Sequence, residues 1–145
     1  MRKLSESKNP QKFSKEEINN LILAAQQLEQ QASRYSQQME ILNSYYNEIQ
    51  SSEQTLIEIN ETRGDHKILM PIGAGNFIYA KIEDTEKVIV TIGAGVHSEN
   101  SLPNAIEGLR RKKEEVENQL TQIKSSYNEV LERLREIDRV VKTVM

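Results

Sequence analysis

One stretch of the chain departs from the helical pattern that fills the rest: residues 66–98, with the sequence HKILMPIGAGNFIYAKIEDTEKVIVTIGAGVHS. It contains three short runs rich in β-branched and aromatic residues, each bounded by glycine or by a polar, acidic cluster. The runs span residues 68–72, 77–82 and 88–92. Runs of this composition and length predict β-strands, so the stretch is expected to form at least one hairpin.

The tetrapeptide Ile-Gly-Ala-Gly occurs twice, at residues 72–75 and 92–95, each time after an apolar run. This repeat predicts two related hairpin units. The second copy is either a turn or a bulge that bends a long strand. A nucleotide-binding loop is rejected because its glycines must lead directly into a helix, whereas the first copy continues into an apolar strand. We therefore expect no cofactor.

Apolar residues occupy both faces of these predicted strands. A sheet of two to four short strands cannot cover both of its faces or remove its own edges. The expected cover is another subunit, and the alternative is a monomer whose helices fold back over the sheet. The residues expected to mediate oligomerisation are Ile68, Met70, Ile72, Phe77, Ile78, Val88, Val90 and Ile92.

Composition indicates a single elongated domain. The chain has 145 residues, of which 5% are aromatic and 28% are charged, so a large globular core is not expected. A net charge of -3 gives no reason to expect nucleic acid or an anionic membrane as a partner. No apolar run approaches the roughly 20 residues of a membrane span, and residues 1–12 lack the apolar region of a signal peptide. We expect a soluble, cytoplasmic protein.

Residues that carry catalytic or metal chemistry are scarce. The chain has no cysteine, and its two histidines are His66 and His97, which argues against a zinc site. No nucleophile is accompanied by a base. The basic run at residues 110–113 is neutralised by glutamates at helical spacing, which favours a solvated helix face over a nucleic-acid patch. We therefore expect no metal, no catalytic residue and no enzyme activity.

A long first helix is predicted for residues 14–63. Ser14 followed by Glu17 forms a capping box at its start, and Gly64 provides a C-terminal stop. Apolar residues then recur in the heptad pattern of a coiled coil, although the seam weakens at Glu53. The seam residues are Ile18, Leu21, Ala25, Leu28, Ala32, Tyr35, Met39, Leu42, Tyr46, Ile49 and Leu56.

A second heptad helix is predicted for residues 101–145, with Ser101 as its cap and Lys113 as the one interruption of its apolar seam. Its seam residues are Leu102, Ile106, Leu109, Val116, Leu120, Ile123, Tyr127, Val130, Leu134, Ile137, Val141 and Val144. Two helices of nearly equal length around a β insert at residues 64–100 predict an antiparallel two-helix coiled coil. Residues 1–13 form a flexible leader. The predicted class is α+β, mainly helical, and pairing with helices of other chains is the alternative arrangement.

Taken together, the two heptad helices and the insert at residues 68–95 resemble the alpha-type subunits of archaeal prefoldin. The resemblance covers nearly the whole chain, and its specific part is the insert, because heptads alone fit many proteins. Asn104 departs from the acidic residue that similar sequences often carry, which weakens one expected cap.

The resemblance implies an ATP-independent molecular chaperone in which two alpha and four beta subunits join their strands into an intersubunit β-barrel. The coiled coils would project from this body, hold non-native proteins at their tips and pass them to a group II chaperonin. A structural coiled-coil adaptor without holdase activity and a small-ligand binding module remain alternatives.

Apolar residues that the seam does not need suggest where clients bind. Ile22 and Leu23 lie outside the seam positions of the first helix, as do Val140 and Met145 in the second. Antiparallel pairing brings both groups to one end of the coiled coil, where an exposed apolar patch suits a protein that grips unfolded chains. The alternative is that Ile22 and Val140 merely widen the seam. The predicted client-binding residues are Ile18, Leu21, Ile22, Leu23, Val140, Val141, Val144 and Met145.

Overall fold

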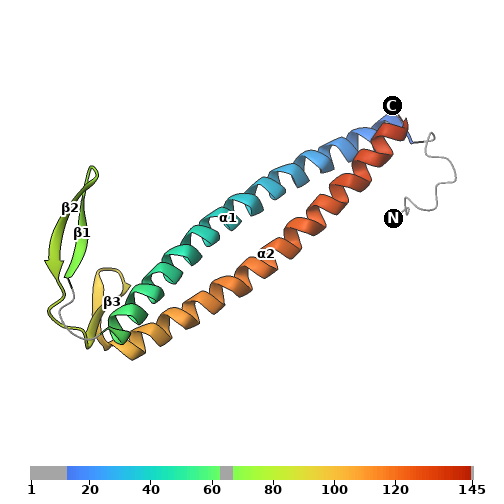
Figure 1. Ribbon diagram of the computed structural model, residues 1–145. Helices are drawn as coiled ribbons and strands as arrows, with labels where there is room; N and C mark the ends of the chain where they lie inside the picture. Colours follow the sequence, from blue (N-terminus) through green and yellow to red (C-terminus); the bar gives the residue numbers. More distant parts are fainter. Residues whose placement is uncertain (1–12, 63–66, 145) are drawn as a thin grey trace. The chain divides into compact units, whose positions relative to one another are not determined.

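The computed structural model describes residues 13–62 and 67–144. Along this part of the chain the elements are α1 (Lys15–Glu61), β1 (Lys67–Gly73), β2 (Asn76–Lys81), β3 (Lys87–Gly93), β4 (Val96–Ser101) and α2 (Leu102–Val144) (Figure 1). The mainly helical α+β fold with hairpins inserted between two long helices is therefore confirmed. The predicted leader, except for Phe13, and the positions of Gly64, His66 and Met145 lie outside the described residues.

These elements form two compact units. The helical unit comprises Met1–Asn43 and Asn118–Met145, so it contains the first part of α1 and the last part of α2. The strand-bearing unit comprises Ser44–Glu117, with the remaining helix segments and both hairpins.

Both helices begin at the caps that the sequence predicts. The hydroxyl of Ser14 accepts a hydrogen bond from the Glu17 N–H at 3.1 Å, and that of Ser101 accepts one from the Asn104 N–H at 3.3 Å. The Leu102 N–H donates to the Glu86 carbonyl at 2.9 Å. These bonds satisfy backbone donors that have no partner inside the helices.

The heptad seams account for most of the buried apolar residues. Every described residue of the two predicted seams is buried or half-buried, and Leu102 is the most deeply buried large side chain among the residues described. In the strand-bearing unit, the Tyr46 hydroxyl donates to Glu117 Oε1 at 3.0 Å, while Glu53, further along α1, meets Lys113, which is earlier in α2. The two helices of one chain therefore pair antiparallel, as predicted.

An ion cluster around a buried carboxylate occupies the seam of the strand-bearing unit. Glu53 Oε2 lies 2.8 Å from Lys113 Nζ, and Glu53 Oε1 lies 3.6 Å from Arg110 Nε. Glu53 is only 8% exposed, and the Lys113 side chain is 24% exposed. The interpretation of residues 110–113 as a solvated face is thus wrong for Lys113, because antiparallel pairing places it against a carboxylate on the other helix. Arg110 reaches the same carboxylate, but its side chain remains 55% exposed. We refer to Glu53, Arg110 and Lys113 as the seam ion cluster.

The cluster shifts the titration of its members. The hydrogen bond from Lys113 lowers the pKa of Glu53 below its ordinary value of 4.5, against the opposing effect of burial, and Arg110 adds to the lowering. The same hydrogen bond raises the pKa of Lys113 above 10.5. On the neighbouring turns, the hydrogen bond to Glu117 raises the pKa of Tyr46 above 10.0. The charged forms of Glu53 and Lys113 are therefore stabilised by folding.

Acidification is expected to weaken the helix pair partly through Glu53. Because its folded pKa is lowered, its contribution to stability is present above pH 4.5 and is lost as the pH falls through the folded pKa. Circular dichroism melts from neutral pH downwards should therefore show a smaller fall in melting temperature for Glu53→Gln than for the parent. Glu40→Gln, at an exposed position of α1, serves as the control and should follow the parent. An equal fall in melting temperature for the parent and both variants would contradict the prediction.

The insert consists of two antiparallel hairpins in separate two-stranded sheets. β1 pairs with β2, with Met70 opposite Ile78, and β3 pairs with β4, with Val90 opposite Ser98. The two related hairpin units expected from the repeat are present. Strand β4 was not predicted, because its sequence VHSENS is polar.

Both copies of Ile-Gly-Ala-Gly form a tight turn together with an irregular register. The register shifts between Pro71 and Gly73 in the first hairpin and between Thr91 and Gly93 in the second. The central turn residues Ala94 and Gly95 have φ values of 48° and 77°, and the first turn has the same pattern. Positive φ at both central residues is typical of type I′ hairpin turns. The sequence left open whether the second Ile-Gly-Ala-Gly is a turn or a bulge. In the structure both copies form a turn accompanied by a bulge.

The same substitution is expected to have opposite effects at two glycines. Gly95→Ala should destabilise the β3–β4 hairpin by about 1 kcal/mol, because a Cβ is strained at positive φ. Gly108→Ala in α2 should instead stabilise the protein by about 0.5–1 kcal/mol, because alanine is the better helix former. Neither new Cβ would meet an atom within 4 Å, so backbone preference alone decides the sign. Chemical denaturation of the two variants measures the change in the free energy of unfolding relative to the parent. Changes of the same sign in both variants would contradict this account.

Candidate functional site

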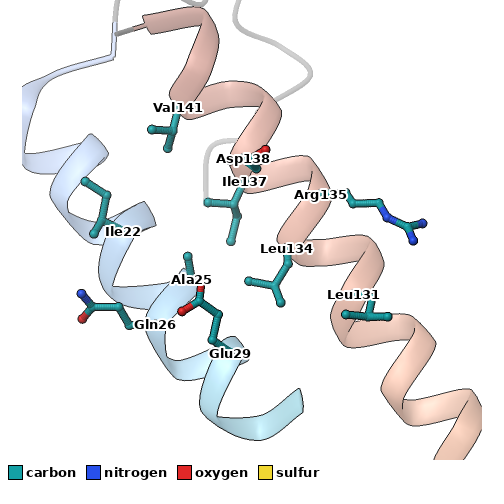
Figure 2. A pocket seen from close by; sticks show the side chains of 10 residues that line it. All are labelled: Ile22, Ala25, Gln26, Glu29, Leu131, Leu134, Arg135, Ile137, Asp138 and Val141. Atoms are coloured by element: carbon teal, nitrogen blue, oxygen red, sulfur yellow. The ribbon is translucent and has the colours of Figure 1, made fainter. Parts of the chain in front are cut away.

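An open groove lies between α1 and α2 in the helical unit, near the first turns of α1 and the last turns of α2 (Figure 2). Its volume is about 540 Å³. The lining residues are Ile22, Ala25, Gln26, Glu29, Leu131, Leu134, Arg135, Ile137, Asp138 and Val141. Its walls are two helix faces, so side chains rather than backbone groups make up most of its surface.

Aliphatic side chains dominate the inner surface of this groove. Figure 2 shows Ala25, Leu134 and Ile137 directed into the space between the helices, whereas Gln26 and Arg135 point away from it. The small side chain of Ala25 occupies a seam position and leaves space that a larger residue would fill. The groove is therefore suited to contacts with apolar side chains of a bound chain, which are non-directional and depend little on the exact sequence bound.

Charged residues border the groove. Asp138 forms an exposed i,i+4 ion pair with Lys142, with Oδ2 and Nζ 3.1 Å apart. Pairs of this kind contribute little to stability. Lys142 also lies in the last turn of α2, where a cation favours the negative end of the helix dipole. In the same turn, the Thr143 hydroxyl lies within hydrogen-bonding distance of the Arg139 and Val140 carbonyls, at 2.9 and 2.8 Å. The end of α2 is thus stabilised by polar groups.

The groove contains some of the residues predicted to bind clients and lacks others. Ile22 and Val141 line it, whereas Leu23 is 58% exposed beside it and does not. The remaining described residues of the predicted set are half-buried: Ile18, Leu21, Val140 and Val144. Met145 lies outside the described residues. Ala25, Leu134 and Ile137 are seam positions in the heptad pattern and were not among the predicted client-binding residues. The small alanine at a seam position is the one feature of the sequence that indicates a groove there.

The hairpins carry a second candidate surface. Of the residues predicted to mediate oligomerisation, Ile68, Met70, Ile72, Phe77, Ile78 and Ile92 are exposed. Val88 and Val90 are half-buried on one face of β3, opposite Asn100 and Ser98. Leu69, Tyr79, Ile89 and Val96 are also exposed and were not in the predicted set. Apolar exposure on this scale is typical of a surface that binds another protein.

Metal sites, catalytic pockets and membrane spans each have their own structural features. Among residues 13–62 and 67–144, no group of three or more acidic or histidine side chains is placed to hold a metal ion. A second hollow, on the β1–β2 hairpin, is lined by Lys67, Tyr79, Ala80 and Lys81, without a paired nucleophile and base. Neither α1 nor α2, as described, has a stretch long and apolar enough to cross a membrane.

Comparison with known proteins agrees with the arrangement of two paired helices and two inserted hairpins. The family model for prefoldin subunits matches residues 28–145. The chain is 31% identical to prefoldin subunit alpha of Methanosarcina barkeri, over 86% of this chain and 89% of the relative. It is 34% identical to prefoldin subunit alpha of Methanosarcina acetivorans, over 82% and 83% of the two chains.

A solved structure shares the fold. A chain of filamentous PFD from Methanocaldococcus jannaschii superimposes with a TM-score of 0.65 at 15% sequence identity, covering 83% of this chain and 98% of that one. Paired heptad helices, two inserted hairpins with exposed apolar faces and a family match over most of the sequence lead to one assignment. The chain belongs to the prefoldin subunit family, whose members are subunits of a chaperone.

Proposed function

We propose that the chain is an alpha-type subunit of an ATP-independent chaperone and that it holds non-native proteins at the free end of its coiled coil. The observation that carries this proposal is the aliphatic groove near the helix ends, in a chain that belongs to the prefoldin subunit family. Unfolded clients differ in sequence but share exposed apolar side chains. A groove lined by Ile22, Leu134, Ile137 and Val141 can contact such side chains without requiring a particular sequence.

The hairpins are the proposed assembly surface. In each two-stranded sheet both strands are edge strands, with backbone groups available for pairing with another chain. The exposed apolar residues of β1 and β2 supply the surface that such pairing would bury. The resemblance to prefoldin implies that the partners are beta-type subunits, with two alpha and four beta chains joining their strands into an intersubunit β-barrel.

The later steps of the proposed activity rest on the resemblance to prefoldin. Clients held at the coiled-coil ends would be passed to a group II chaperonin in the cytoplasm. Holding by apolar contact needs no nucleotide, metal or other cofactor, because binding and release are governed by the affinity for exposed apolar side chains. No chemical step on the client is required.

Suppression of aggregation tests the proposal. The chain, assembled with a beta-type subunit, is added to a chemically denatured client at the moment of dilution, without ATP, and light scattering is recorded. We expect scattering to fall as the complex is added, and the client to become folding-competent when a group II chaperonin with ATP follows. Undiminished scattering from a correctly assembled complex would instead favour a structural coiled-coil adaptor. Suppression without transfer would refute only the chaperonin step.

A further inference from the structure

Each heptad seam contains one charged residue, and the two charged residues contact each other. Among the seam positions of α1 the charged residue is Glu53, and among those of α2 it is Lys113. Their side chains meet at 2.8 Å, with Arg110 3.6 Å from the second carboxylate oxygen. The seam ion cluster is therefore a matched interruption in two stripes that are otherwise apolar, apart from Asn60 near the end of α1.

Burial makes this match necessary. Glu53 is almost wholly removed from solvent, and Ile49 on α1 and Val116 on α2, one turn away along each helix, are buried apolar residues. A carboxylate in such surroundings is strongly disfavoured unless opposite charges compensate it. Lys113 and Arg110 provide this compensation from the other helix.

Any other heptad register loses the compensation. If α2 slides by one heptad in one direction, Glu53 comes level with Glu117 and Leu120, so that one carboxylate faces another. If it slides the other way, Glu53 comes level with Pro103 and Ile106, and Lys113 with Tyr46. The apolar seam positions that do not face Glu53 or Lys113 after the slide tolerate it, because they meet other apolar residues one heptad away.

The connection between the helices is not a short loop of the kind that fixes the register by itself. Glu61 and Leu102 are joined through two hairpins in separate sheets that share no ladder hydrogen bonds in the part of the chain that the structure describes. Short loops that fix the alignment of antiparallel helices are absent from that part. We infer that Glu53, Lys113 and Arg110 select a single register of the antiparallel helix pair in the strand-bearing unit.

Removing the charges while keeping the seam apolar tests the inference. The variant Glu53→Leu/Lys113→Leu should retain its helix content and melt at the same or a higher temperature, because a buried ion pair is often no more stabilising than an apolar one. Its register should nevertheless become heterogeneous. A role in stability alone predicts the opposite pair of results, a lower melting temperature with one register.

Register is read from spin-label distances in the full chain, which has no native cysteine. Labels on Glu58→Cys and Glu115→Cys occupy exposed positions that are displaced along the helix axis in the observed register. A slide of one heptad changes this displacement by about 10 Å. The parent should give one distance distribution, and the doubly apolar variant at least two.

Two further variants complete the experiment. Ile49→Leu/Val116→Leu alters apolar seam residues beside the cluster and should keep one distribution. Glu53→Lys/Arg110→Glu/Lys113→Glu exchanges the charges and should restore one distribution. If the apolar variant loses helix content, Glu53→Gln/Lys113→Gln replaces it, with the same expectation. A single distribution matching that of the parent, in the doubly apolar variant or in its glutamine replacement, would overturn the inference.

Discussion

Replacing Ile78 with aspartate is expected to prevent assembly with beta-type subunits while leaving the helix signal of the chain unchanged. Ile78 is 47% exposed and pairs with Met70 across the β1–β2 hairpin. If this face is buried between subunits, the new carboxylate loses its water without gaining a partner, at a cost of several kcal/mol. Each 1.4 kcal/mol weakens an association about tenfold, so a change of more than 100-fold is expected.

Native mass measurement of the mixed subunits distinguishes the outcomes. The parent should give a complex of several chains, and Ile78→Asp should give free chains with the parent's circular dichroism. Glu83→Lys, an exposed charge change between β2 and β3, serves as the control and should assemble normally. A complex of unchanged mass with Ile78→Asp would show that the β1–β2 face is not the interface. The equivalent change at Ile89, which is 74% exposed, would then test the β3–β4 hairpin.

The helices were predictable because local chemistry determines them. The hydroxyls of Ser14 and Ser101 mark helix starts whatever the rest of the chain does, and heptad spacing follows from helix geometry. Three of the four strands had the β-branched and aromatic composition of a half-buried sheet. β4 did not, because its pairing with β3 comes from a turn that brings a polar segment alongside an apolar one.

The seam ion cluster and the groove depend on contacts between segments that are far apart in the sequence, so local sequence patterns do not predict them. The seam weakness at Glu53 and the interruption at Lys113 were separate observations, and only antiparallel alignment shows that they compensate each other. The basic run was interpreted from its neighbours along one helix, although its partner is on the other helix. The groove depends on the pairing of α1 with α2 around Ala25, which an assignment of each seam by itself does not reveal.

The exposed strand residues illustrate a third limit. The sequence indicates that both faces of the strands are apolar, but not which face the chain itself covers. In the structure, Val88 and Val90 are half-buried, whereas Ile89 between them is highly exposed. The alternation within β3 therefore makes Ile89 a better target for an assembly experiment than either valine, because a change there disturbs fewer contacts within the chain.

Serine substitutions at Ile22, Leu23, Val140 and Val144 are expected to impair client protection without dissociating the complex. These residues lie near the start of α1 and the end of α2, away from the hairpins in sequence, and Ile22 lines the groove. Loss of one fully buried aliphatic contact removes about 1.5–3 kcal/mol of binding free energy, which corresponds to at least tenfold weaker client binding at that position. Because the tips of beta-type subunits would also contact clients, the loss of protection should be partial and should differ between clients.

The matched control is Ile41→Ser, which removes an exposed isoleucine from α1 outside the groove. It should protect clients as the parent does. Serine is a weaker helix former than the residues it replaces, so circular dichroism and complex mass must match the parent before activity is compared. Protection is then measured as the amount of complex needed to halve light scattering. If the assembled serine variant protects every client as well as the parent and Ile41→Ser do, clients are held elsewhere. The groove between α1 and α2 would then be only a widened seam, the alternative that Ile22 and Val140 left open.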